Sequence, residues 1–140
     1  MVCKRMIENA KRLLHREDCS CAVVSADGAE LILNGQGLAP VIDLLRENPE
    51  LLRGAAAADK VIGRAAAMLL AYGGVSSIWG DIMSRPALDF LRESNIEASY
   101  GTLVPVLMNR VGSGQCPMEA KAAALDSAEE AYRAFVLGSN

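Results

Sequence analysis

The chain of 140 residues is poor in aromatic residues, in histidine and in long hydrophobic runs. Aromatic residues make up 4% of it and there is one histidine, so we expect a core of small aliphatic side chains and closely packed helices. The longest apolar stretch, Ala65 to Tyr72, is much shorter than the roughly 20 residues that cross a bilayer. The N-terminus is charged throughout and is unlike a signal peptide. These absences predict a cytoplasmic protein that does not contact membranes.

Positive charge and cysteine are also scarce. The net charge is -3 and no basic stripe is visible, which argues against binding to a nucleic-acid backbone. Four cysteines do not make a dense disulfide framework, and in a reducing compartment we expect free thiols. With 51% apolar residues, the chain is long enough for one folded domain with a substantial core.

Hydrophobic periodicity predicts alternating helices and strands in one domain, residues 1–140, with an N-terminal helix over 1–16 packed on it. The expected strands cover Cys21–Val24, Leu31–Leu33, Gly54–Ala58, Val75–Trp79 and Ile96–Tyr100, the first two as a hairpin. Further helices are expected to begin near Pro40, Lys60, Ser84, Pro117 and Ala128, and the one from Lys60 to Tyr72 is apolar nearly all round. This alternation predicts an α/β sandwich around one mixed sheet.

Two helix starts carry polar side chains in an otherwise apolar chain. Asp59 and Lys60 stand at the first of them, with Arg64 one turn further on. Free backbone N–H groups and the helix dipole favour anions there, so Lys60 and Arg64 are candidate contacts for a phosphate or carboxylate. Asp59 is a candidate proton acceptor or ligand contact. The alternatives are that Asp59 is simply the N-cap of the helix and that Arg64 is a surface charge.

The second helix start is the segment Cys116-Pro117-Met118-Glu119. Proline suits the first helical position, and Glu119 stands three residues after Cys116, as in a capping box. A thiol at a helix N-terminus can become nucleophilic because its pKa is lowered there, which makes Cys116 and Glu119 candidate catalytic residues. The alternative is a buried thiol that caps the helix, and the negative charge of Glu119 favours that interpretation.

Two further groups are candidate ligand contacts. The glycine-rich loop before Cys116 contains Arg110, Gly112 and Gly114, and glycine lets a backbone approach a ligand closely. The alternative is that this loop is only a connection. Asp81 and Ser84 follow the strand Val75–Trp79, where open α/β sheets usually bind ligands.

The order of elements and four short motifs resemble the cytidine-deaminase-like superfamily, and more closely a small prokaryotic family of unknown function within it. The motifs are Ala58-Asp59-Lys60-Val61-Ile62-Gly63, Met83-Ser84-Arg85-Pro86-Ala87-Leu88, Tyr100-Gly101 and Cys116-Pro117-Met118-Glu119. The similarity runs from about Cys21 to Tyr132. It implies a three-layer α/β/α sandwich with a pocket at these helix starts, in a bacterial protein.

Zinc deaminases place H-x-E at one helix start and P-C-x-x-C at the next, so that histidine and two thiolates hold the metal. In this chain the first position has Asp59-Lys60, and the second has Pro86 followed by Ala87 and Phe90 where the cysteines would be. Neither Ala87 nor Phe90 can bind zinc. The resemblance therefore implies the fold and the place of a pocket without metal or cofactor.

Two patterns that suggest metal sites receive structural interpretations. His15-Arg16-Glu17 matches H-x-E, but it ends the first helix before any strand, where histidine and arginine suit the helix dipole. Cys19-x-Cys21 places two thiols on one face of a strand start, which makes at most half of a metal site, and we expect both thiols to be packed in the core.

The sequence thus predicts a domain that binds a small anionic or nucleotide-like ligand near Asp59 and Cys116, without zinc-dependent deamination. One alternative is an enzyme with non-zinc chemistry at Asp59, Lys60, Cys116 and Glu119. Another is a structural domain, since its alanine-rich helices could pack between subunits of a homo-oligomer. A catalytic or binding site requires Asp59, Cys116 and Glu119 to meet at one cleft, whereas a structural domain would bury them separately.

Overall fold

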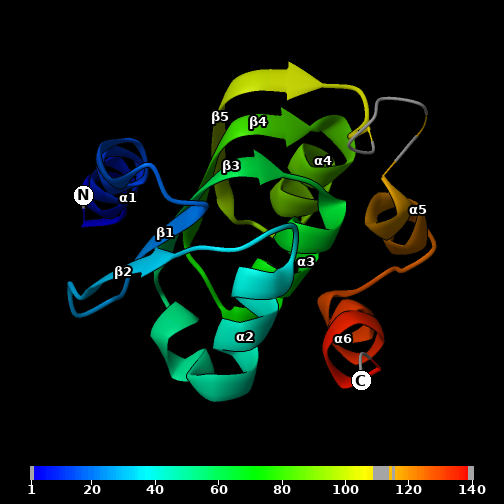
Figure 1. Ribbon diagram of the computed structural model, residues 1–140, viewed down its shortest axis with the longest axis horizontal. Helices are drawn as coiled ribbons and strands as arrows, with labels where there is room; N and C mark the ends of the chain where they lie inside the picture. Colours follow the sequence, from blue (N-terminus) through cyan, green and yellow to red (C-terminus); the bar gives the residue numbers. More distant parts are fainter. Residues whose placement is uncertain (1, 109–113, 115, 139–140) are drawn as a thin grey trace.

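A computed structural model describes residues 2–108, 114 and 116–138 and shows one five-stranded mixed sheet (Figure 1). The strands are β1 (Cys21–Val24), β2 (Glu30–Leu33), β3 (Ala56–Ile62), β4 (Ser77–Ser84) and β5 (Glu97–Val104), and they lie in the order β2-β1-β3-β4-β5. β1 pairs antiparallel with both β2 and β3, whereas β3, β4 and β5 run parallel. The predicted hairpin and mixed sheet are confirmed.

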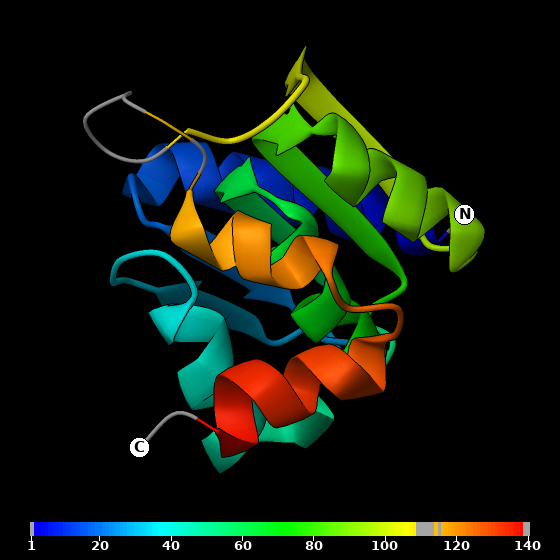
Figure 2. The ribbon, with the colours of Figure 1, turned by 90° about the vertical axis from the view of Figure 1, so that its right-hand side faces the viewer.

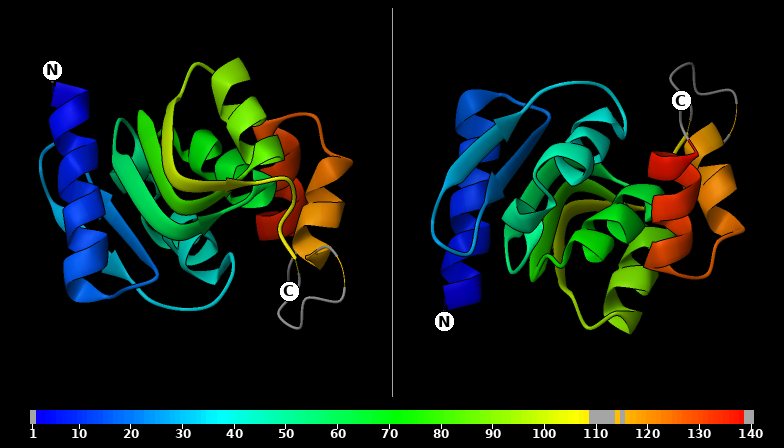
Figure 3. Two further views of the ribbon diagram at one scale, coloured as in Figure 1. Left: turned by 90° about the horizontal axis from the view of Figure 1, so that it is seen from above. Right: turned by 90° about the horizontal axis from the view of Figure 1, so that it is seen from below.

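Helices cover both faces of this sheet (Figure 3). One face carries α1 (Val2–Glu17), and the other carries α2 (Ala39–Glu47), α3 (Arg64–Gly73) and α4 (Arg85–Glu93). A short 3-10 turn, η1 (Pro49–Leu52), follows α2. Outside α3 lie α5 (Pro117–Ala123), α6 (Ala128–Ala131) and the π-helical turn η2 (Tyr132–Leu137), as Figure 2 shows. The predicted three-layer sandwich is confirmed, and none of the described helices is long and apolar enough to cross a membrane.

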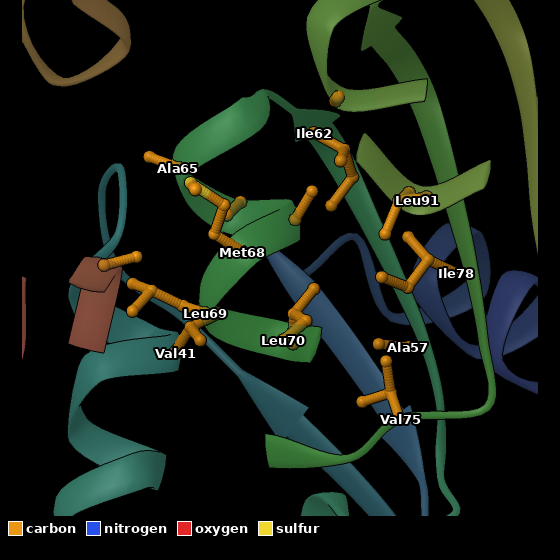
Figure 4. Packing of buried hydrophobic residues seen from close by; sticks show 14 of the residues in the cluster. Val41, Ala57, Ile62, Ala65, Met68, Leu69, Leu70, Val75, Ile78 and Leu91 are labelled. Atoms are coloured by element: carbon orange, nitrogen blue, oxygen red, sulfur yellow. The ribbon is translucent and has the colours of Figure 1, made fainter. Parts of the chain in front are cut away.

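The central helix α3 is buried over residues 65–70, and Tyr72 in its last turn is exposed. It packs against the sheet and α4, and α5 and α6 close its outer face. Figure 4 shows Met68, Leu69 and Leu70 within the main core. Gly74 ends the helix with φ 91°, a left-handed conformation that suits glycine, so the helix end predicted from Gly73-Gly74 is confirmed.

A second, smaller apolar cluster holds α1 on the opposite face. Leu13 and Leu14 of α1 are buried there against Ala56 and Ala58 of β3. Ala57, between them in sequence, faces the main core instead, as strand alternation requires. The alanine-rich strand therefore supplies both cores and lets the helices on either side approach closely.

The boundary between β3 and α3 differs from the prediction. β3 runs through Asp59 and Lys60 to Ile62, and α3 begins at Arg64 with Gly63 as its N-cap. The prediction that Asp59 N-caps a helix beginning at Lys60 is therefore wrong. The reason is tertiary, because parallel pairing with β4 continues to the end of β3 and buries Ile62 in the main core.

The other boundaries are closer to expectation. The helix starts predicted near Ser84, Pro117 and Ala128 are confirmed. β4 continues to Ser84 and β5 to Val104, several residues beyond the predicted ends.

Candidate functional site

A cavity opens where β1 and β3 separate. The two strands pair up to Cys21 and Asp59, and one more backbone bond joins Lys60 N–H to the Ser20 carbonyl at 3.3 Å. Beyond it lies a cavity of about 540 Å³, at the carboxyl end of β3, where open α/β sheets usually bind ligands. It is bounded by the end of β3, the loop after β2, and the starts of α2, α3 and α5; the lining residues are Ser20, Gly35, Gly37, Leu38, Val41, Asp59, Lys60, Val61, Gly63, Ala66, Leu107, Met108, Cys116, Pro117, Met118 and Glu119.

The structure brings four predicted site residues to this one cavity, namely Asp59, Lys60, Cys116 and Glu119. Four other candidates, which are Arg64, Asp81, Ser84 and Gly114, are not among its lining residues. Arg110 and Gly112 lie outside the residues that the structure describes. The apolar walls formed by Leu38, Val41, Leu107 and Met118 were not predicted from the sequence. The one local sign of them is the pair Gly35 and Gly37, which have positive φ in the loop beside these walls.

Asp59 is the cavity's most perturbed acid. Its carboxylate accepts a hydrogen bond from the Val61 N–H at 3.1 Å. Burial raises the pKa of Asp59 to about 6 and the charge of Asp81 adds to this, while hydrogen bonds from the Val61 N–H and the Cys21 thiol oppose it. A carboxyl group in a cavity whose pKa is raised by burial is a typical feature of functional sites.

Cys21 and Cys19 are structural thiols. Burial, together with the negative charge of Asp59, raises the pKa of Cys21 well above its ordinary value, and burial also raises the pKa of Cys19. Cys21 packs in the main core, whereas Cys19 packs in the cluster under α1. The two thiols therefore do not share a face as predicted, although the expected packing role is confirmed. Together with Cys116, which is partly exposed, they are free thiols.

Lys60 is engaged in an ion pair. Its ammonium group lies 2.5 Å from a carboxylate oxygen of Asp18, at the end of α1. This contact raises the pKa of Lys60 and lowers the pKa of Asp18. The predicted role of Lys60 as a cation at a helix start is wrong in position, since it lies on β3 rather than on a helix.

Glu119 caps α3 instead of its own helix. Its carboxylate accepts hydrogen bonds from the backbone N–H groups of Arg64 at 2.6 Å and Ala65 at 3.1 Å. Gly63 permits this approach, because a Cβ there would lie 2.5 Å from the Glu119 carboxylate. The predicted capping box is wrong, as the Cys116 side chain makes no cap bond and its backbone N–H bonds to the Leu107 carbonyl.

Arg64 and Ser84 have structural contacts. The Arg64 guanidinium donates to the carbonyls of Ala122 at 3.2 Å and Leu125 at 2.8 Å, so it ties α3 to the end of α5. Ser84 is fully buried and N-caps α4 by accepting a hydrogen bond from the Ala87 N–H at 3.2 Å. Neither residue is available to a ligand in this cavity.

Asp81 lies on the α1 face of the sheet. It accepts a hydrogen bond from the Trp79 indole N–H at 2.7 Å, and His15 Nε2 lies 2.8 Å from the same carboxylate oxygen. The His15 side chain is half exposed at the end of α1, as predicted for the H-x-E match. This cluster is separate from the cavity.

The observed start of α3 changes which residues stand where the first zinc-binding motif of the deaminases would lie. The residues at the α3 start are now Gly63, Arg64 and Ala65, and none of these types is a zinc ligand in the deaminase pattern. Ala87 and Phe90 at the α4 start are buried in the main core. In the described part of the chain, no three histidine, cysteine, aspartate or glutamate side chains are grouped to hold a metal.

Comparison with known proteins gives a family and a fold. The family model TM1506, a domain of unknown function (DUF1893), matches residues 9–136. A crystal structure of a DUF1893 family protein (TM1506) from Thermotoga maritima is similar with a TM-score of 0.86 and 26% sequence identity, covering 97% of this chain and 91% of that one. A crystal structure of dCMP deaminase from the cyanophage S-TIM5 has a TM-score of 0.47 and 11% identity, covering 71% of this chain and 96% of that one. No curated protein matches the chain.

Proposed function

The chain belongs to the TM1506 family, a domain of unknown function (DUF1893), and we propose that the cavity at the end of β3, beside the starts of α2, α3 and α5, binds a small ligand. The observation that carries this proposal is the cavity of about 540 Å³ at the carboxyl end of β3. It has mostly apolar walls and two carboxylates, Asp59, whose pKa is raised by burial, and Glu119, which caps α3. Ligand sites typically have volumes of roughly 300–1,000 Å³ and a few polar groups among apolar walls.

The contacts in the cavity favour the base of a nucleotide-like ligand over its phosphate. A base-like ring could lie against Leu38, Val41 and Met118 while its polar edge meets Asp59. A phosphate would need the free N–H groups on which the prediction of an anionic ligand depends, and those of Arg64 and Ala65 already bind Glu119. The apolar, base-like character is therefore the better supported half of that prediction.

A ligand screen by thermal unfolding tests the proposal. A compound that binds the folded state raises the unfolding temperature in a concentration-dependent way. Met118→Trp narrows the cavity from an exposed position on α5, and Leu137→Trp, at an exposed position of η2, is the matched control. We expect the active compounds to lose their effect in Met118→Trp and to keep it in Leu137→Trp. The proposal fails if no compound raises the unfolding temperature, or if the compounds raise it equally in both variants. The structural-domain alternative would then be favoured.

We further propose that the domain does not carry out zinc-dependent deamination. Ala87 and Phe90 stand where zinc-binding thiolates would be required, and both are buried in apolar surroundings. Metal analysis of purified, untagged protein should find no stoichiometric zinc. Bound zinc whose removal by a chelator abolishes cytidine deamination would contradict this.

A catalytic role is the second candidate function, and Asp59 favours it because its pKa of about 6 suits proton transfer. Cys116 lines the same cavity and is partly exposed, so it is the available nucleophile. Lys60 is paired with Asp18, and Glu119 caps the start of α3. Of the four predicted catalytic residues, Asp59 and Cys116 therefore remain as the candidates. If Cys116 resists iodoacetamide until the protein unfolds, this candidate loses its nucleophile.

A further inference from the structure

The ligand's head group can be inferred from the polar groups that the cavity leaves available, an inference that rests on the function proposed above. The Glu119 carboxylate occupies the position that a ligand anion would take at the start of α3, because its two oxygens accept hydrogen bonds from the first N–H groups of this helix. It is buried, with 6% of its surface exposed. A ligand anion at this helix start would have to expel a buried carboxylate that is held by two charge-assisted hydrogen bonds.

The cationic and hydroxyl side chains of the lining are also engaged. Lys60 pairs with Asp18 at 2.5 Å. The Ser20 hydroxyl donates to the Gly35 carbonyl at 2.8 Å and accepts from the Gly35 N–H at 3.3 Å. Among the described lining residues, an incoming anion would therefore meet two carboxylates, Asp59 and Glu119, and a lysine that is paired with Asp18.

Asp59, in contrast, keeps capacity to accept hydrogen bonds. An ionised carboxylate has about four acceptor positions. Its contacts in the protein are the Val61 N–H at 3.1 Å, the Cys21 thiol and the Lys60 backbone N–H, which leaves room for a further donor. The remaining lone pairs belong to a partly exposed side chain in a cavity with apolar walls, where a charge-assisted hydrogen bond is stronger than in water.

We propose that this cavity selects a small molecule with an ammonium or amidinium head group, which pairs with Asp59, and an apolar body, which lies against Leu38, Val41 and Met118. The head group supplies positive charge and N–H donors to Asp59, whereas the one lysine among the described lining residues, Lys60, is paired with Asp18. The apolar walls accept the body without further polar contacts. Anions of the same size are disfavoured by Asp59 and Glu119 together.

Matched probes test this selectivity. Benzamidine and benzoate have the same apolar ring and opposite charges, and inorganic phosphate represents a free anion. Each is titrated into protein with labelled methionine and alanine methyl groups, and Met118 and Ala66 report binding in the cavity. We expect benzamidine to bind about tenfold or more tightly than benzoate, with no shift of these methyl signals by phosphate.

The variant Asp59→Asn removes the charge while keeping the size of the side chain. It is expected to fold, since it replaces a desolvated carboxylate by a neutral group. Benzamidine affinity should fall about tenfold in this variant and stay unchanged in Asp89→Asn, a surface control on α4 that pairs with Arg85.

The outcomes separate this inference from the proposed function. Binding of benzoate or phosphate in the cavity as tightly as benzamidine would overturn the selectivity and leave the ligand site standing. Unchanged benzamidine affinity in Asp59→Asn would also overturn it. If neither the probes nor any screened compound shifts the Met118 and Ala66 methyl signals, the proposed ligand site itself fails.

Discussion

Glu119 shapes the cavity and stabilises α3 through the same carboxylate. The side chain is buried and caps a helix whose own N-cap residue, Gly63, has no side chain to offer. We expect Glu119→Ala to lower the free energy of unfolding by about 1–3 kcal/mol, because two backbone N–H groups lose a charged acceptor. Chemical denaturation followed by circular dichroism measures this loss.

The matched control for Glu119→Ala is Glu129→Ala. Glu129 is exposed and pairs with Arg133 one turn further on, which is a contact worth a few tenths of a kcal/mol. A loss as small in Glu119→Ala as in Glu129→Ala would show that the α3 start does not depend on this carboxylate.

Asp59 makes stability depend on pH in a defined direction. Its pKa of about 6 in the folded protein exceeds the ordinary value of 3.8, so the folded state keeps the proton over a range in which the unfolded state has lost it. The free energy of unfolding therefore falls as pH rises from about 4 to about 6. Above that range, the full cost of ionising Asp59 in the folded protein applies. The groups that act on this carboxyl are the backbone N–H groups of Val61 and Lys60, the Cys21 thiol and the charge of Asp81.

Asp59→Asn should remove this penalty. We expect the variant to be more stable than the wild type by about 1–3 kcal/mol at pH 7.5, and the difference to shrink towards zero near pH 4. Urea denaturation of both proteins at several pH values gives the difference directly, and Asp89→Asn supplies the surface control. A difference that is constant with pH would mean that Asp59 titrates normally in the folded protein.

At the scale of elements, periodicity and turn residues predicted the order of strands and helices but not where β3 ends. Residues 55–58 are four alanines, which show no alternation and favour helix, so Asp59 looked like a cap. What makes Asp59, Lys60 and Val61 a strand is pairing with β4, a contact between distant segments.

The sequence also predicted part of the candidate site. The sequence located Asp59 and Cys116, and the structure places both at one cavity. It did not reveal that Glu119 caps a helix that begins 55 residues earlier in the chain, because local spacing made it look like part of a capping box with Cys116. The local sign of this contact is Gly63, because a glycine N-cap has no side chain that could accept a hydrogen bond from the first N–H groups of α3.

The start of α4, in contrast, is determined locally. Ser84 accepts the Ala87 N–H, and Pro86 occupies the first turn, so the helix start is fixed by adjacent residues. We expect Ser84→Ala to lower the free energy of unfolding by about 1–2 kcal/mol, because the hydroxyl is fully buried. Ser94→Ala, at the exposed end of the same helix, should change it by less than about 0.5 kcal/mol. Equal effects in a thermal melt would argue against the cap.

At the scale of the whole molecule, the sheet joins two apolar clusters that share no helix. α1 covers one face and the remaining helices cover the other, while neighbouring residues of β1 and β3 alternate between the two clusters. Because the same strands support both clusters, losing α1 should expose Ala56 and Ala58 and weaken the sheet. We therefore expect α1 to unfold together with the rest of the domain.

Trp79 makes this testable, since it is the only tryptophan and packs against the α1 cluster, with the Lys11 ammonium 3.8 Å from its ring centroid. Its fluorescence reports the α1 face, whereas far-ultraviolet circular dichroism reports all helices. The two denaturation curves should coincide, as for a two-state domain. Leu14→Ala, at a fully buried position, should lower the free energy of unfolding obtained from both curves by about 2–5 kcal/mol. Leu137→Ala, at an exposed position, should leave it nearly unchanged. A fluorescence transition that precedes the circular dichroism transition in Leu14→Ala would show that α1 is a separate unit docked on an independently stable sheet.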